Sequence, residues 1–133
     1  MIIEKIATIA NKHLTLLKVL TFVWLFLITL LCIIPQEELP DAGGIPNFDK
    51  FVHFVLYFVM AVLSLFVFSG YKPSHKIIIV TLIFIFSFFI EVMQGIMPFG
   101  RTFSFTDLLA NLSGILTGLL LFQKKLKHLP SQR

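Results

Sequence analysis

The sequence predicts an all-α membrane protein with four transmembrane helices, and three observations support this fold class. Hydrophobic residues make up 57% of the chain and charged residues only 14%, whereas about 25% of a typical globular domain is charged. The apolar residues fall into four stretches, each close to the ~20 residues that a helix needs to cross a bilayer. Turn-forming or charged residues separate these stretches. A chain of 133 residues has room for one domain, which we place at residues 1–133.

The four predicted transmembrane helices cover residues 14–34, 51–69, 77–97 and 105–122. The first contains Lys18, whose long side chain can reach the membrane surface, and Pro35 ends it. No small-residue cleavage site follows this segment. We therefore interpret it as a retained helix and not as a signal peptide.

Proline, glycine and capping residues define the other boundaries. Residues 35–48 are rich in Pro, Gly and acidic residues, which is typical of a loop, and residues 70–76 form a short turn. Pro98 ends the third helix, and Ser104 or Thr106 is expected to cap the fourth. Trp24 falls in the middle of the first helix, so we expect it to pack between helices.

The distribution of Lys and Arg predicts how the helices are oriented. Nine of these residues lie in the N-terminal region, the second connection and the C-terminal tail: Lys5, Lys12, Lys18, Lys72, Lys76, Lys124, Lys125, Lys127 and Arg133. Only Lys50 and Arg101 lie in the first and third connections. Since cytoplasmic segments are enriched in Lys and Arg, both the N- and C-termini should be cytoplasmic. Short loops predict antiparallel neighbours, in a multi-pass protein of the cell inner (cytoplasmic) membrane.

The second predicted helix begins with a polar face on the extracytoplasmic side. Asp49, His53 and Tyr57 are spaced by four residues, which places them on one side of a helix, and Lys50 adjoins them. The third predicted helix ends at the same side of the membrane with Glu91 and Gln94, three residues apart. Charged groups at membrane depth cost about 2.5–3.5 kcal/mol on insertion scales, so they are candidates for a functional site.

The fourth predicted helix carries a continuous stripe of polar and then small residues. Its members are Ser104, Asp107, Asn111, Gly114 and Gly118, at steps of three and four residues, and Arg101 precedes them. Gly114 and Gly118 favour close packing of two helices. The rest of this helix should face lipid through Leu108, Leu109, Leu112, Ile115, Leu116 and Leu119.

Together these polar residues predict a ligand-binding pocket on the extracytoplasmic side. Its members are Asp49, Lys50, His53, Tyr57, Glu91, Gln94, Arg101, Ser104, Asp107 and Asn111. Lys50 and Arg101 could bind a phosphate or carboxylate. The catalytic candidates are His53, Glu91 and Asp107, as a general base and acid. The alternative is a structural network of ion pairs.

Several other chemistries are not predicted. His53, Glu91 and Asp107 could ligate a metal, but the chain lacks an H-E-x-x-H or paired-Cys pattern, so we predict no metal and no cofactor. No serine-hydrolase elbow, phosphate loop or dinucleotide fingerprint is present. No basic surface with interleaved aromatic residues indicates nucleic-acid binding. Cys32 is the single cysteine, so it has no disulfide partner within the chain.

Three segments resemble the VanZ-like family: DKFVHFVLYF at 49–58, EVMQ at 91–94 and RTFSFTDLLANLSG at 101–114. The family pattern carries over to Asp49, Lys50, His53, Phe54, Tyr57, Glu91, Gln94, Arg101, Ser104, Asp107, Asn111 and Gly114. The founding member is associated with low-level resistance to teicoplanin, a lipoglycopeptide that acts outside the cytoplasmic membrane on cell-wall precursors. The resemblance therefore implies a role in the cell envelope and names no reaction.

These observations leave several hypotheses for the function. The first is binding or modulation of an envelope lipid, a lipid-linked cell-wall precursor or a lipoglycopeptide. The second is an intramembrane enzyme that acts on lipid-linked envelope substrates, with His53 and either Glu91 or Asp107 as acid and base. The third is a structural protein that partners another membrane protein. A proton-coupled transporter ranks last, because the cytoplasmic half offers no polar path.

Overall fold

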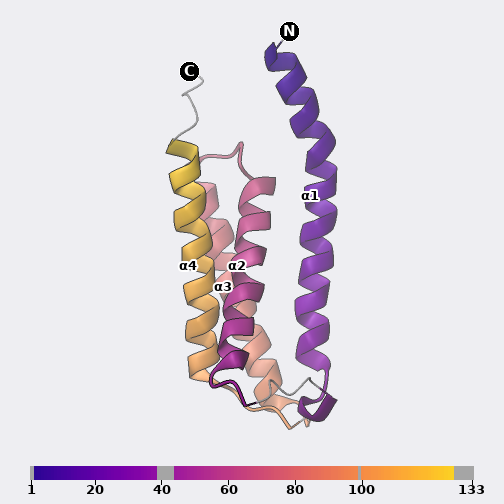
Figure 1. Ribbon diagram of the computed structural model, residues 1–133, viewed down its shortest axis with the longest axis vertical. Helices are drawn as coiled ribbons and strands as arrows, with labels where there is room; N and C mark the ends of the chain where they lie inside the picture. Colours follow the sequence, from indigo (N-terminus) through magenta and orange to yellow (C-terminus); the bar gives the residue numbers. More distant parts are fainter. Residues whose placement is uncertain (1, 39–43, 99, 128–133) are drawn as a thin grey trace.

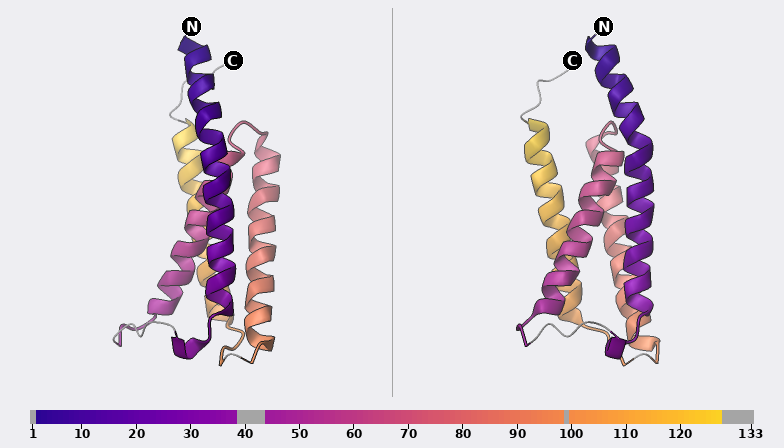
Figure 2. Two further views of the ribbon diagram at one scale, coloured as in Figure 1. Left: turned by 90° about the vertical axis from the view of Figure 1, so that its right-hand side faces the viewer. Right: turned by 45° about the vertical axis from the view of Figure 1, so that its right-hand side comes forward.

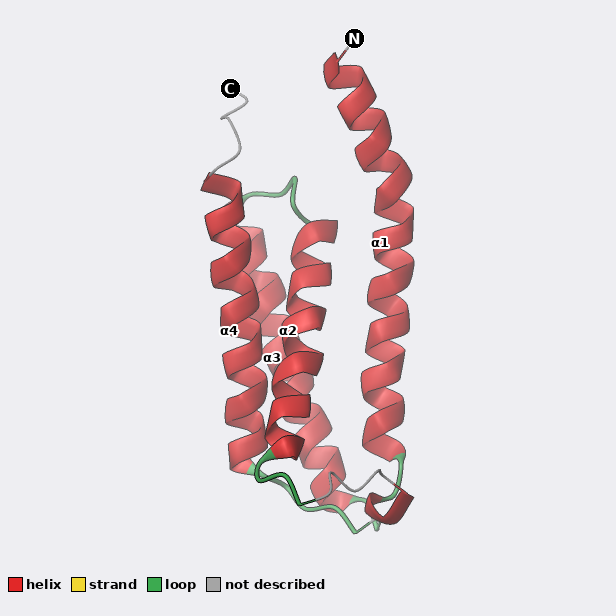
Figure 3. Cartoon of the chain, viewed as in Figure 1, coloured by secondary structure: helices red, strands yellow, loops and turns green. Residues whose placement is uncertain are grey.

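The computed structural model is built from four long helices that lie side by side (Figure 1). It describes residues 2–38, 44–98 and 100–127, which contain α1 (Ile2–Ile33), α2 (Phe48–Val67), α3 (Pro73–Ile96) and α4 (Phe105–Lys127). The 3-10 helix η1 (Gln36–Glu38) follows α1, and the described residues contain no strand (Figure 3). Each long helix contains an apolar window long enough to cross a membrane. An all-α fold with four helices of membrane-spanning length is therefore confirmed.

The helices extend beyond the apolar segments that the sequence marks. Helix α1 begins at Ile2, α2 begins at Phe48, and α3 begins at Pro73. Hydropathy locates only the part that crosses the bilayer, whereas backbone hydrogen bonding continues into the flanking residues. A proline fits the first turn of α3 because the N–H that it lacks would have no partner within the helix.

Two predicted segments fall partly outside the described part of the chain. Residues 39–43 of the predicted loop lie outside it, and so does the predicted tail from residue 128 onward, Arg133 included. Ser104 caps α4 as predicted, because its Oγ accepts a hydrogen bond from the backbone N–H of Asp107 at 3.2 Å. Thr106 Oγ1 lies 3.0 Å from Ser104 Oγ and supports the same turn.

Helices α2 and α4 make their closest approach at the two glycines of α4. A Cβ atom at Gly114 would overlap the carbonyl oxygen of Phe54 and would lie 3.0 Å from the backbone nitrogen of Phe58. At Gly118 a Cβ would lie 3.1 Å from the Cβ of Ala61. The predicted close packing through small residues is confirmed, and it involves the α2 backbone itself.

The predicted lipid-facing side of α4 is wrong for two of its residues. Leu109 and Leu116 are exposed, as expected, but Leu108 and Ile115 are buried. Helix α4 packs against α3 as well as α2, so it presents two buried sides and a narrower exposed one. Ile115 joins a core that also contains Leu65 of α2.

Helix α1 lies at the edge of the bundle and extends past the other helices at its N-terminal end (Figure 2). Phe22 and Phe26 of α1 are exposed, whereas Ile28 is buried against the core. The indole Nε1–H of Trp24 donates a hydrogen bond to the carbonyl oxygen of Leu56 in α2 at 2.8 Å. The prediction that Trp24 packs between helices is thus confirmed.

Candidate functional site

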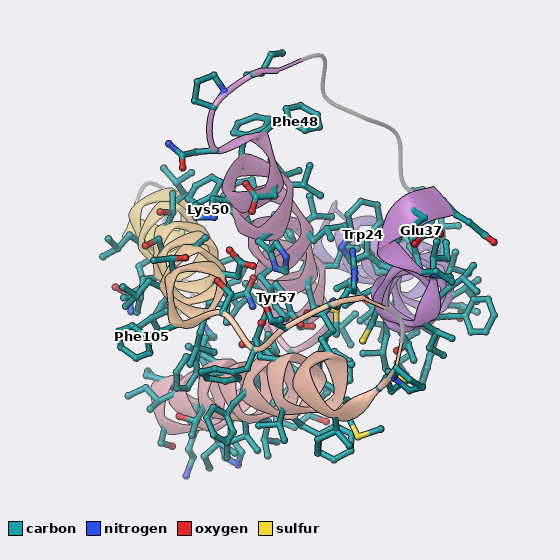
Figure 4. All side chains as sticks on the ribbon, turned by 90° about the horizontal axis from the view of Figure 1, so that it is seen from below. Trp24, Glu37, Phe48, Lys50, Tyr57 and Phe105 are labelled. Atoms are coloured by element: carbon teal, nitrogen blue, oxygen red, sulfur yellow. The ribbon has the colours of Figure 1, made fainter. Side chains whose placement is uncertain are left out.

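The predicted polar residues meet at one end of the bundle, which we call the polar end. Along the face of α2, side-chain exposure falls from 60% at Asp49 to 17% at His53, and Tyr57 is buried. Figure 4 looks at this end of the bundle and shows Tyr57 among the helices, with Phe105 at the periphery. The face predicted from the four-residue spacing therefore leads from solvent into the interior.

Lys50 joins α2 to α4 at the polar end. Its Nζ lies 2.9 Å from Asp49 Oδ2 and 3.2 Å from Asp107 Oδ1. We predicted that Lys50 would hold an anionic ligand, but its ammonium already lies between two carboxylates. Its main contribution is to compensate the charge of Asp107, whose side chain is only 15% exposed.

His53 is the centre of a group of four residues from three helices, which we call the His53 cluster: His53, Glu91, Asp107 and Asn111. His53 Nδ1 lies 3.0 Å from Asn111 Oδ1 and 3.6 Å from Glu91 Oε1. On the other side of the ring, Nε2 lies 3.8 Å from Asp107 Oδ2. The imidazole therefore separates two carboxylates, one from α3 and one from α4.

Glu91 is the most deeply placed charged group of the His53 cluster. Its side chain is fully buried, and Oε1 accepts a long hydrogen bond of 3.5 Å from Asn111 Nδ2. Burial of a carboxylate in a low-dielectric interior is unfavourable unless a cation or a proton compensates its charge. Among the ion pairs of the described residues, Glu91 has His53 as its partner. Glu91 and Asp107 therefore both have partners on a neighbouring helix.

Two hydroxyl groups are buried near this end of the interior without a hydrogen-bond partner among the described residues. They belong to Tyr57 of α2 and Ser87 of α3. Buried hydroxyls in folded proteins normally have a partner, either protein or water. Tyr57 also lines the pocket described next, although its hydroxyl oxygen is itself buried.

A pocket of about 920 Å³ opens at the polar end between α1, α2 and the residues that join α3 to α4. Its apolar lining residues are Ile28, Leu31, Ile45, Phe48, Val52, Leu56 and Ile90. Its polar lining residues include Asp49, His53, Tyr57, Gln94, Arg101, Ser104 and Asp107. This volume is in the range of small-molecule sites, about 300–1,000 Å³. The pocket suits a ligand that is itself part apolar and part polar.

The other predicted site residues have distinct positions around this pocket. Arg101 lines it, and its Nη1–H donates a hydrogen bond to the carbonyl oxygen of Leu31 at 3.0 Å, which ties the segment after α3 to the end of α1. Gln94 is buried and also lines the pocket. Glu91 and Asn111 lie behind His53 and do not form part of the lining.

Sequence reasoning missed the contribution of α1 and of two loop residues. Leu31 and Cys32 of α1 line the pocket, as do Glu37 and Thr102. The Cys32 thiol lies 3.9 Å from the carbonyl oxygen of Ile90. Beyond Lys18, α1 is almost entirely apolar, so hydropathy does not indicate which of its faces meets the other helices.

Comparison with known proteins identifies a family. A family model described as VanZ/LLP1 matches residues 3–127, which include all of the predicted site residues. No curated protein and no solved structure matches the chain. The resemblance that the three sequence segments predicted is confirmed.

Proposed function

The chain belongs to the VanZ/LLP1 family of membrane proteins, and we propose that it binds an amphipathic molecule of the cell envelope in the pocket at its polar end. The observation that carries this proposal is the mixed lining of the pocket, which combines large apolar side chains with polar and charged ones. An envelope lipid, a lipid-linked cell-wall precursor and a lipoglycopeptide share the required chemistry: a hydrocarbon chain joined to a polar head group.

We further propose that the polar end faces away from the cytoplasm. Nine of the eleven Lys and Arg residues lie in the first part of α1, at the start of α3, and from the end of α4 onward. The beginning of α1 and the end of α4 lie at the end of the bundle opposite the pocket (Figure 1). With antiparallel neighbouring helices and the positive-inside rule, this supports cytoplasmic termini in a multi-pass protein of the cytoplasmic membrane.

In the proposed mode of binding, the apolar and the polar lining residues contact different parts of the ligand. The hydrocarbon chain lies against Ile28, Leu56 and their neighbours, where it is removed from water. The polar head group meets the guanidinium of Arg101, which lines the pocket. Arg101 retains N–H groups beyond the one that Leu31 accepts, and a planar guanidinium suits phosphate or carboxylate oxygens.

Native mass spectrometry of the purified protein in detergent tests this proposal. A phospholipid, a lipid-linked wall precursor and a lipoglycopeptide are offered separately to wild type, to Asp107→Asn and to the control Glu38→Gln. Glu38 is an exposed acid at the same end of the bundle that does not line the pocket. We expect one of the three to bind wild type and Glu38→Gln. Binding should be lost in Asp107→Asn, because Asp107 lines the pocket and its carboxylate contacts Lys50 and His53, so its neutralisation rearranges the polar lining. Absence of binding to wild type, or equal binding by all three proteins, would contradict the proposal.

Growth of a sensitive host provides a second test of the lipoglycopeptide as ligand. Teicoplanin carries an acyl chain and vancomycin does not. The apolar lining residues of the pocket favour a ligand that has such a hydrocarbon chain. Expression of the protein should therefore raise tolerance to teicoplanin more than tolerance to vancomycin. Equal growth with and without the protein would leave the lipid and the wall precursor as the proposed ligands.

A second candidate function is acid–base catalysis on a lipid-linked substrate. The observation that favours it is the position of the His53 imidazole between the carboxylates of Glu91 and Asp107. Such an arrangement can take a proton from one side and return it on the other. Turnover of a lipid-linked substrate should then be abolished in His53→Ala and retained in His75→Ala, whose histidine is exposed at the opposite end. Turnover that survives His53→Ala would exclude this function.

A further inference from the structure

We propose that His53, Glu91 and Asp107 bind a divalent metal ion. Each residue offers one ligand atom, and the three atoms lie within 4.8 Å of one another. Ligand atoms on a tetrahedral zinc ion lie about 3.3–3.6 Å apart, because each bond is about 2.0–2.2 Å long. The ligand atoms therefore have to approach one another by about 1 Å, and the His53 ring, whose two nitrogens face different carboxylates, has to turn one nitrogen toward the ion. Because the three residues come from three different helices, no spacing within one segment of the sequence predicts the site.

The charges of the ion-paired residues at the polar end favour a cation with two positive charges. Asp49, Glu91 and Asp107 supply three carboxylates, and Lys50 supplies one ammonium that contacts only the first and third of them. Asp49 is largely exposed to solvent, so the carboxylates that most need compensation are the buried Glu91 and the mostly buried Asp107, and a divalent cation between them would supply it.

A second and independent observation, two buried polar atoms without a hydrogen-bond partner, supports a metal ion and its bound water beside the His53 cluster. The hydroxyl of Tyr57 lies one helical turn deeper than His53 and lines the pocket, yet the residue is only 1% exposed. Among the described residues this hydroxyl has no hydrogen-bond partner, and neither has Glu91 Oε2. A bound ion would engage the carboxylate, and a water molecule on the ion would offer the hydroxyl a partner.

The chemistry of the ligands narrows the choice of ion. One imidazole and two carboxylates suit Zn²⁺ or Mn²⁺, whereas Mg²⁺ and Ca²⁺ prefer oxygen ligands alone. The amide oxygen of Asn111, 3.0 Å from His53 Nδ1, is positioned to orient the ring or to join the coordination. His53 and Asp107 line the pocket, so an ion between them is within reach of a phosphate oxygen of a bound ligand. That last role rests on the proposed function, whereas metal binding itself does not.

Titration of the purified protein with the ions alone tests the proposal. Wild type is stripped with a chelator and then titrated with Zn²⁺ and with Mn²⁺ by calorimetry, and the bound metal is counted by mass spectrometry. We expect one ion per chain, and affinity reduced by about tenfold or more in Glu91→Gln and in Asp107→Asn, since even outer-shell changes cost about that much. The matched controls Glu38→Gln and His75→Gln should bind as wild type does.

Two results would overturn the proposal. One is wild type that holds no ion after titration, which would leave His53 and Lys50 as the partners of the two carboxylates. The other is unchanged binding in both Glu91→Gln and Asp107→Asn. Protein that binds lipid but no metal contradicts only the metal site, and protein that binds metal but no lipid contradicts only the proposed function.

A spectroscopic measurement on wild type keeps the test independent of how the variants fold. X-ray absorption at the zinc edge should show an imidazole and further nitrogen or oxygen ligands at about 2.0–2.2 Å. Cys32 also lines the pocket, and a zinc–sulfur distance of about 2.3 Å would assign the ion to its thiolate. A sulfur ligand would therefore also overturn the proposal.

Discussion

Helix α2 contacts α4 through glycines and contacts α1 through large side chains with a pocket between them. On the α4 side, Gly114 lies against the α2 backbone, and the His53 cluster adds a direct contact of 3.0 Å between His53 and Asn111. On the α1 side, one tryptophan hydrogen bond joins α1 to α2, and Arg101 ties the end of α1 to the segment between α3 and α4.

The difference between the α2–α4 and α1–α2 contacts corresponds to two separate requirements of a binding site. Charged groups at membrane depth need fixed partners, because a carboxylate that loses its partner in a low-dielectric interior is strongly destabilising. The ligand, in contrast, needs a way in. We interpret the α2–α4 contact as the fixed half that holds the charges and the α1–α2 contact as the half that adapts to the ligand.

The largest loss of stability is expected at the closest approach of α2 and α4 in the fixed half. Gly114→Ala places a methyl group against the Phe54 carbonyl oxygen, a backbone atom that cannot rotate away. Overpacking typically costs about 1–3 kcal/mol and occasionally more, and this site should lie at or above the upper end. Thermal unfolding in detergent, followed by circular dichroism, measures the loss.

Gly70→Ala is the matched control for this substitution. A Cβ at Gly70 meets nothing within 4 Å, so its unfolding temperature should stay close to that of wild type. If Gly114→Ala unfolds at the same temperature as Gly70→Ala, then α2 and α4 are free to separate and the distinction between the two halves fails.

A smaller loss of stability, together with greater mobility of α1, is expected on the adaptable half. Arg101→Gln removes a charged hydrogen bond to the Leu31 carbonyl, and such bonds contribute about 1.5–3 kcal/mol. Because Arg101 is partly exposed, we expect the lower figure, together with greater freedom of α1. Spin labels at the exposed positions Leu30 and Phe51 should report a broader distribution of distances between α1 and α2.

Lys72→Gln serves as the control for this measurement, since Lys72 is an exposed basic residue at the opposite end of the bundle. It should leave the distance distribution unchanged. A distribution in Arg101→Gln as narrow as in wild type would show that α1 is held by its other contacts, and the adaptable half would have to be sought elsewhere.

The smallest loss of stability is expected for substitutions at the start of α4. Ser104→Ala removes the hydroxyl that caps the N–H of Asp107, at a typical cost of about 1 kcal/mol. Thr106→Ala removes only a contact between two hydroxyls and should cost less. Chemical denaturation of both variants tests this order, and a larger loss in Thr106→Ala would reverse the assignment of the cap.

Much of the fixed half follows from local sequence patterns. Hydropathy locates four helices, and steps of three and four residues place Asp107, Asn111 and Gly114 on one side of α4. The capping role of Ser104 depends on residues close to it in the chain, so it was predictable as well. The contact between Gly114 and α2 follows from the general preference for small residues at helix interfaces.

The adaptable half and the detailed pairing depend on contacts between distant segments. Nothing in an apolar helix indicates that the Leu31 carbonyl accepts a hydrogen bond from Arg101, seventy positions later in the chain. The burial of Ile115 reflects a second neighbouring helix, which a single helical face does not reveal. The engagement of Lys50 by two carboxylates likewise depends on how far apart α2 and α4 lie.

Trp24 gives the protein a natural optical probe of its adaptable half. It is the single tryptophan in the chain, and its indole is bonded to Leu56, a residue that lines the pocket. Fluorescence excited at tryptophan wavelengths therefore originates from one known place between α1 and α2. A change in its emission on addition of a ligand would follow the separation of these helices in the unlabelled wild-type protein, in real time and without any engineered residue.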